Sequence, residues 1–192
     1  MTLSADGKTL ATVQRKNAQN LSISPGAGSA SPELPSIVPS GERVSGFGWD
    51  TSGNLLIGES GHLSRMRPDG TNSSQVLGDA ASAIVDPAAC GTRYIVFSWV
   101  FHAGARNANI WRANADGSNP VKLTDMASRY PLCSPDGKWV YYENDAAGQM
   151  WRVPADGSGK AEVIPGSLVP NTILAGLPPS LAPDGKLLGT LL

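Results

Sequence analysis

A chain of 192 residues is long enough to form one domain with a substantial hydrophobic core. Charged residues make up only 16% and the formal net charge is −1, so the sequence carries no basic stripe for nucleic acid. No apolar run reaches the roughly 18 residues of a membrane-spanning helix, and the start, MTLSADGKTL, lacks the pattern of a signal peptide.

A tight turn recurs along the chain, and an apolar strand follows it each time. Asp-Gly pairs suit such turns because both residues tolerate the reversed backbone conformation. The turns lie at 4–8, 50–54, 90–93, 134–138 and 182–186, and the strands that follow read TLATVQ, LLIGES, YIVFSW, WVYYEN and LLGTLL. The turn glycines, Gly7, Gly53, Gly91, Gly137 and Gly185, are 46, 38, 46 and 48 residues apart. The chain is therefore predicted to repeat one structural unit.

Each full unit also contains a second turn and a closing strand. The second turn reads RMRPDGTN, RANADGSN and RVPADGSG, with SISPGAGS as a degenerate first copy. A period of about 45 residues with about four short strands is typical of a β-propeller. Helical repeats would need apolar spacing of 3.6 residues, which is absent, and a β-sandwich would not repeat its turn chemistry at a fixed interval. We predict an all-β fold with four-stranded antiparallel blades.

The repeats predict a single propeller domain or fragment over 1–192, an incomplete arc of about four to five blades. The predicted blades, numbered 1 to 5, cover 1–38 (partial), 39–79, 80–125, 126–169 and 170–192 (partial). Strands such as YIVFSWVF fit this fold, because blades packed face to face bury both faces of a sheet. A ring of four blades, closed by pairing 172–182 with the first unit, is the less favoured alternative. An open arc would leave apolar faces uncovered, so self-association through its ends is also considered.

The repeated S-P-D-G-K, the apolar strand and the W-R-x-x-A-D-G-S segment resemble the TolB-like, WD-type propeller family across nearly the whole chain. The segments LSADGKTLATVQ, NIWRANADGSNPVKLTD and CSPDGKWVYY are similar to propeller regions that follow the kinase domain in bacterial receptor-like serine/threonine kinases. This resemblance implies a sensing or scaffolding role outside the cytoplasm. No kinase motif is present, so phosphoryl transfer is not expected of this chain.

The sequence also lacks patterns for other chemistry, and we predict no catalytic residue, no metal site and no cofactor. The segment 58–61 only approaches a G-x-S-x-G elbow, and the two histidines lie in different repeats. Histidines and cysteines show no metal-binding spacing, and the Asp-Gly pairs and 157–160 are interpreted as turns. The chain is accordingly expected not to be an enzyme.

The cysteines and tryptophans are interpreted as core residues. Cys90 and Cys133 lie at nearly equivalent points of neighbouring repeats, where a bridge is geometrically conceivable. Two cysteines are too few for a disulfide scaffold, however, and we favour two small buried apolar side chains. Trp111 and Trp151 occupy the same place in two repeats, as core residues do.

A candidate binding face follows from the predicted topology. Loops between the second and third strands, and between consecutive blades, meet at the end opposite the tight turns, and such loops are a common place for binding. The candidate residues are Arg15, Lys16, His62, His102, Arg106, Arg129, Tyr130 and Glu143.

The sequence therefore predicts a non-catalytic module that binds a protein or a small ligand within a larger bacterial protein, such as a receptor-like kinase. The alternatives are a propeller cap that gates a prolyl-oligopeptidase-like hydrolase, and a free periplasmic TolB-like protein.

Overall fold

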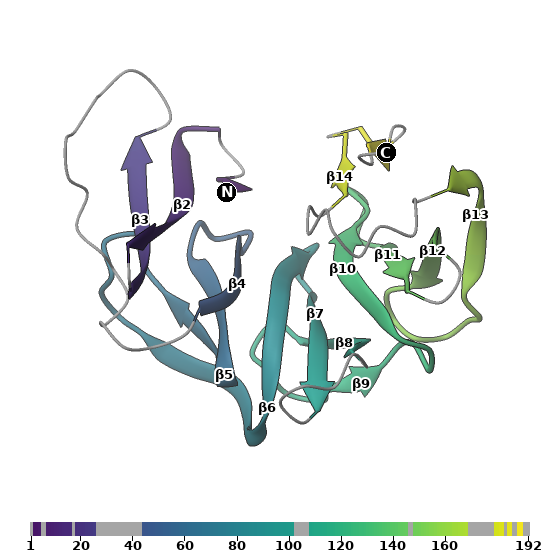
Figure 1. Cartoon of the computed structure of the whole chain (residues 1–192), viewed down its shortest axis with the longest axis horizontal. Helices are drawn as coiled ribbons and strands as arrows, with labels where there is room; N and C mark the ends of the chain where they lie inside the picture. Colours follow the sequence, from purple (N-terminus) through teal and green to yellow (C-terminus); the bar gives the residue numbers. More distant parts are fainter. Residues whose placement is uncertain are drawn as a thin grey trace.

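A computed structural model describes residues 2–4, 7–16, 18–25, 44–101, 108–145, 148–168, 179–182, 184–185 and 188–189. All regular elements in these ranges are β-strands, and their sheets fan out in an arc, with β4, β10 and β14 on its inner side (Figure 1). The strands are β1 (Thr2–Leu3), β2 (Thr9–Lys16), β3 (Ala18–Pro25), β4 (Val44–Trp49), β5 (Leu55–Met66), β6 (Ser74–Cys90), β7 (Tyr94–Phe101), β8 (Ala108–Asn114), β9 (Val121–Lys122), β10 (Ser128–Cys133), β11 (Trp139–Asn144), β12 (Gln149–Pro154), β13 (Glu162–Leu168), β14 (Ser180–Leu181) and β15 (Leu188–Gly189).

The described strands form four sheets, and every pairing is antiparallel. Blade 1 contributes β1-β2-β3, blade 4 contributes β10-β11-β12-β13, and blade 5 contributes β14-β15. Blades 2 and 3 share one sheet, β4 to β9, in which β5 and β6 each run through two predicted strands. The first part of β5 pairs with β4, and the later part of β5 pairs with β6. The later part of β6 pairs with β7. The predicted all-β class and the four-stranded antiparallel pattern are confirmed.

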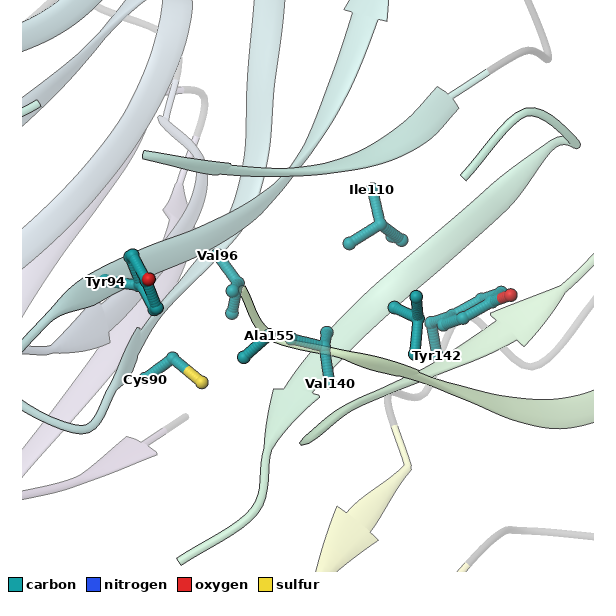
Figure 2. Close-up of a cluster of buried hydrophobic side chains, with 8 residues drawn as sticks. Cys90, Tyr94, Val96, Ile110, Val140, Tyr142 and Ala155 are labelled. Carbon is teal, nitrogen blue, oxygen red and sulfur yellow. The ribbon is translucent and has the colours of Figure 1, made fainter. Parts of the chain in front are cut away.

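Within the described ranges, the core consists of three apolar clusters, each placed between two consecutive blades. Between blades 1 and 2 lie Ala11, Leu21, Val44, Leu55, Ile57 and Met66. Between blades 2 and 3 lie Leu56, Leu63, Ile84, Ile95, Phe97, Trp99 and Ala113. Between blades 3 and 4 lie Cys90, Tyr94, Val96, Ile110, Val140, Tyr142, Val153 and Ala155 (Figure 2). Alternate residues of β7 thus enter different clusters, which is why this strand is apolar throughout.

Glycines bring the inner strands of blades 2 and 3 into close contact. A Cβ atom on Gly48 would lie 2.3 Å from the Pro87 carbonyl oxygen, and one on Gly58 would lie 2.2 Å from the Ile84 carbonyl oxygen. Any larger residue there would separate β4 and β5 from β6.

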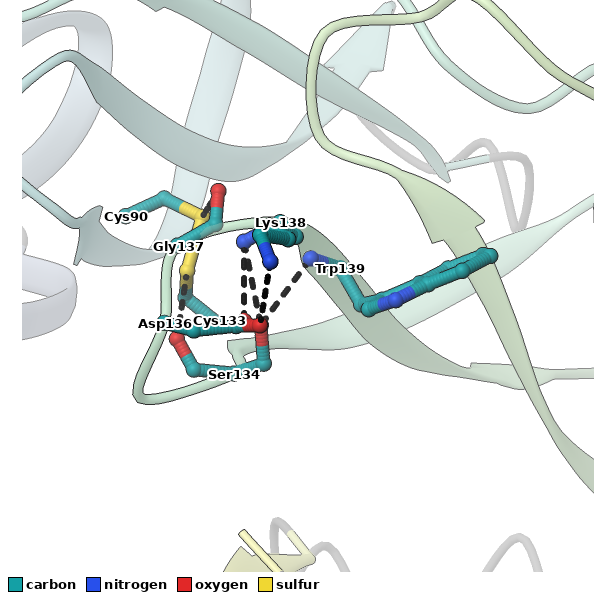
Figure 3. Close-up of polar contacts among 7 residues, drawn as sticks. All are labelled: Cys90, Cys133, Ser134, Asp136, Gly137, Lys138 and Trp139. Atoms are coloured by element: carbon teal, nitrogen blue, oxygen red, sulfur yellow. Dashed lines mark hydrogen bonds and ion pairs between the residues drawn. A yellow bond between two sulfur atoms is a disulfide. The ribbon is translucent and has the colours of Figure 1, made fainter.

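The interpretation of the cysteines as unlinked core residues is wrong, because Cys90 and Cys133 form a disulfide (Figure 3). Cys90 ends β6 and Cys133 ends β10, so the bridge joins the inner strands of blades 3 and 4. Their Cα atoms are 5.0 Å apart, within the usual span of a disulfide. Sequence spacing placed them at equivalent points, but only the approach of the two blades brings the sulfur atoms together.

The Asp-Gly pairs at 69–70, 116–117, 136–137, 156–157 and 184–185 form turns, as predicted. In the turn after β10, Asp136 Oδ1 accepts hydrogen bonds from the Ser134 hydroxyl at 2.6 Å and the Lys138 amide at 3.1 Å (Figure 3). These hydrogen bonds lower the pKa of Asp136.

Trp111 and Trp151 pack against the apolar clusters, which confirms their interpretation as core residues. The described residues include no helix long and apolar enough to cross a bilayer.

Candidate functional site

Two residues on the inner strands of blades 3 and 4 share an uncommon backbone conformation. Asp86 in β6 has φ 51° and Tyr130 in β10 has φ 55°, although neither is glycine. Each precedes a proline and lies at a shift in the pairing register, so the two occupy equivalent bulges. Left-handed non-glycine residues cost about 1–3 kcal/mol each and often mark ligand sites.

Charged groups surround these two bulges. Arg129, next to Tyr130, forms an ion pair and hydrogen bond with Asp145, which raises the pKa of Arg129. Burial raises the pKa of Asp86 to about 6, and the nearby positive charge of Arg129 opposes this rise. Burial raises the pKa of Tyr130 as well, and the charge of Asp86 adds to the effect. Glu143, opposite Arg129 in the β10–β11 register, also has a raised pKa because of burial and the charge of Asp145. We call these five residues the inner cluster.

The structure brings together three of the predicted binding residues, Arg129, Tyr130 and Glu143, and adds two that sequence reasoning missed. Asp86 had a signal in the sequence, because Asp86-Pro87 parallels Tyr130-Pro131 at the same point of the repeat. Asp145 had no comparable signal. A binding role for these residues stays a prediction.

The other predicted residues lie elsewhere. Arg15 and Lys16 are at the end of β2 in blade 1, and the structure does not describe their side chains. His102 and Arg106 lie outside the described residues. His62 lies in β5 of blade 2.

His62 takes part in a separate polar group around a buried carboxylate. Glu59 is 3% exposed, and its Oε2 atom lies 2.6 Å from His62 Nε2. The same oxygen accepts a hydrogen bond from the Ser64 hydroxyl at 3.1 Å. Because Ser64 and His62 both bind the carboxylate rather than each other, this arrangement does not activate the serine as a nucleophile.

A cleft of about 410 Å³ opens on the face formed by the tight turns, opposite the predicted binding loops. Its lining residues come from blades 2 and 3: Asp50, Thr51, Ser52, Asn54, Arg65, Ala89, Gly91, Thr92, Tyr94, Ile95, Ala115 and Asp116. Arg65 crosses the cleft, with Nε 2.9 Å from Asp50 Oδ2 and Nη2 2.7 Å from the Ala115 carbonyl oxygen. The sequence offered one signal for this cleft. The turn at 90–93 is shorter than the equivalent turns of the other repeats, and a shorter turn covers less of this face. Within the described part of the chain, no group of three His, Cys, Asp or Glu side chains is placed to hold a metal.

Comparisons with solved structures define the fold. A protein assigned as TolB from Agrobacterium tumefaciens is 18% identical with a TM-score of 0.62; the match covers 84% of this chain and 62% of that one. Oligogalacturonate lyase from Vibrio parahaemolyticus is 15% identical with a TM-score of 0.62, over 97% of this chain and 56% of that one. Prolyl oligopeptidase B from Galerina marginata is 12% identical with a TM-score of 0.60, over 88% of this chain and 28% of that one.

These likenesses show a TolB-like β-propeller fold and confirm that part of the predicted resemblance. The chain spans less than two thirds of the length of each of these proteins. No family model and no curated protein matches the sequence.

The comparisons also correct the expectation that the chain is not an enzyme. Oligogalacturonate lyase is an enzyme, and it shares this fold over almost the whole chain. The fold therefore does not separate binding modules from enzymes. The missing kinase and hydrolase motifs gave no ground for excluding every other chemistry.

Proposed function

We propose that the chain is the binding module of a larger bacterial protein and that it contacts a protein or small ligand through the inner cluster. The observation that carries this proposal is the pair of equivalent left-handed bulges at Asp86 and Tyr130, within a group of charged side chains. Both residues lie in paired inner strands of adjacent blades, so the charges around them are positioned before a partner arrives. Such preorganisation reduces the entropy lost on binding.

The disulfide supports a place outside the cytoplasm. All the cysteines are paired in Cys90–Cys133, and structural disulfides persist mainly in oxidising compartments. Together with the kinase-linked resemblance of the repeats, this favours the sensing region of a receptor-like serine/threonine kinase.

Site-specific photocrosslinking in living cells tests the binding face without a known ligand. A benzophenone amino acid replaces Tyr130 in the whole natural protein, and the control carries it at Lys160, which is exposed on the face of the tight turns. We expect a discrete crosslinked product from position 130 and none from position 160. Equal products from both positions, or none from either, would contradict the proposed face.

A second candidate is a cap that gates a serine hydrolase, which the likeness to prolyl oligopeptidase B favours. The likeness to TolB supports a third, a free periplasmic partner-binding protein. The flanking coding sequence separates them. Kinase motifs and a membrane span upstream support the sensor, a downstream G-x-S-x-G segment supports the cap, and an upstream signal peptide alone supports the free protein.

A further inference from the structure

One arginine recurs in the third strand of three successive blades. Arg65, Arg112 and Arg152 each stand five residues before the glycine of the following Asp-Gly turn. Arg65 is in β5, Arg112 in β8 and Arg152 in β12. The equivalent positions allow the contacts of the three side chains to be compared directly.

The first two arginines reach into the next blade. Arg65 Nη2 donates a hydrogen bond of 2.7 Å to the carbonyl oxygen of Ala115, and Arg112 Nη2 donates one of 3.3 Å to the carbonyl oxygen of Asp156. Both acceptors belong to the turn between the third and fourth strands of the next blade. Arg112 also lies 4.7 Å from the centre of the Tyr94 ring and is only 8% exposed. Each arginine therefore joins its blade to the turn of its neighbour.

The hydrogen bonds, ion pair and ring contact of Arg152 all lie within its own blade among the described residues. Its Nε and Nη2 atoms lie 3.1 Å and 2.9 Å from Glu162 Oε2, and its guanidinium lies 4.3 Å from the centre of the Trp139 ring. Its side chain is 40% exposed. No carbonyl group of a fifth blade accepts a hydrogen bond from it within the described ranges.

A fifth blade nevertheless starts beside blade 4. β14 and β15 pair antiparallel and supply its first two strands. A Cβ atom on Gly185 would lie 2.9 Å from Pro135 Cδ, so the turn of blade 5 sits against the first turn of blade 4. The described part of blade 5 contains no third or fourth strand, which are the strands whose turn would face Arg152.

We propose that the outward face of blade 4 docks the outer hairpin of a fifth blade of the same repeat, and that Arg152 donates a hydrogen bond to a carbonyl group of its turn. The face consists of Leu132, Tyr141, Arg152 and Glu162, which lie in register across the four strands. It continues the series of interfaces between blades 2 and 3 and between blades 3 and 4. The partner is a β-hairpin closed by an Asp-Gly turn.

The test adds such a hairpin to the chain. A second copy of residues 108–125, which contain β8, an Asp-Gly turn and β9, is joined to the C-terminus through a flexible Gly-Ser linker. A short linker gives a millimolar effective concentration, so we expect the extension to raise the folding equilibrium constant about tenfold. The measurement is urea unfolding followed by tryptophan fluorescence.

Two controls make the result specific. Arg152→Met should remove most of the gain from the extension while changing the unextended chain little, because its present ion pair is exposed. Arg67→Met, at an exposed arginine after β5, should leave the gain intact. An extension that adds no stability would overturn the proposal, as would a gain that survives Arg152→Met or that a scrambled hairpin reproduces.

Discussion

The interface on one side of β7 is aromatic, whereas the interface on its other side is crosslinked. Toward blade 2, Phe97 and Trp99 have ring centres 5.7 Å apart, and Trp99 and Trp111 have ring centres 4.9 Å apart. Trp99 Nε1 donates a hydrogen bond of 2.6 Å to the Ser82 hydroxyl. This interface depends on large rings packed with specific geometry.

Toward blade 4, β7 contributes Tyr94 and Val96 to a cluster with smaller side chains (Figure 2). Here the disulfide and the hydrogen bond from Arg112 to the Asp156 carbonyl oxygen supplement the apolar contacts. The difference shows that the repeat fixes strands and turns, while each interface is stabilised by its own set of contacts. Stability in repeat proteins is largely a sum of such nearest-neighbour terms.

Phe97→Ala tests the aromatic interface and is expected to have the largest effect. Phe97 is 0% exposed, and its truncation leaves a cavity between blades 2 and 3. We expect a loss of about 3–5 kcal/mol in the free energy of unfolding, measured with urea. Val96→Ala removes less apolar volume from the opposite face and should cost less. Equal losses would contradict the dominance of the aromatic interface.

The double variant Cys90→Ala/Cys133→Ala tests the crosslinked interface. The bridge closes a sequence separation of 43, and its removal gives the unfolded chain more freedom. We expect a loss of about 2–4 kcal/mol in the free energy of unfolding. A reducing agent should destabilise the wild type to a similar degree and leave the double variant unchanged. A wild type that is insensitive to reduction would disprove a structural role for the bridge.

The fold was predictable because its signals are local. Asp-Gly turns at a regular spacing and strands that are apolar on both faces specify antiparallel blades without any knowledge of long-range contacts. The disulfide was not predictable in the same way. Its formation depends on the approach of the ends of β6 and β10, where a Cβ atom on Gly137 would lie 3.4 Å from the Gly91 Cα atom.

The candidate site was predictable only in part, for a related reason. The predicted loops selected Arg129, Tyr130 and Glu143, although the structure places these residues inside β10 and β11 rather than in loops. Asp86 comes from the neighbouring blade and joins them only through the packing of two inner strands. A single sequence gives the order of the strands, but not which side chains meet between blades.

Asp86→Asn tests the electrostatic contribution of the inner cluster, beside the crosslinked interface. The folded pKa of Asp86 is about 6 and its ordinary value is 3.8, so folding favours the protonated acid. The protonated Asp86 carboxyl stabilises the folded wild-type protein below pH 4, and this stabilisation is lost as the pH rises through 6. Asn stays neutral and tolerates the positive φ, so the variant should be more stable by about 3 kcal/mol at pH 7.5 and equal at pH 3.5. A stability difference between the two proteins that does not change with pH would exclude this cause.

Ser82→Ala and Ser98→Ala form a matched pair with the smallest expected effects. Both serines are buried, at 8% and 1% exposure, and they belong to neighbouring strands. Ser82 accepts the hydrogen bond of the Trp99 indole, whereas Ser98 Oγ has no hydrogen-bond partner among the described residues. Ser82→Ala leaves a buried N–H group unpaired and should cost about 1–2 kcal/mol, while Ser98→Ala removes an unpaired hydroxyl and should be neutral or stabilising. Urea unfolding of the two variants measures both values. If Ser98→Ala costs as much as Ser82→Ala, the hydrogen bond between Trp99 and Ser82 does not distinguish the interface between blades 2 and 3 from the interface between blades 3 and 4.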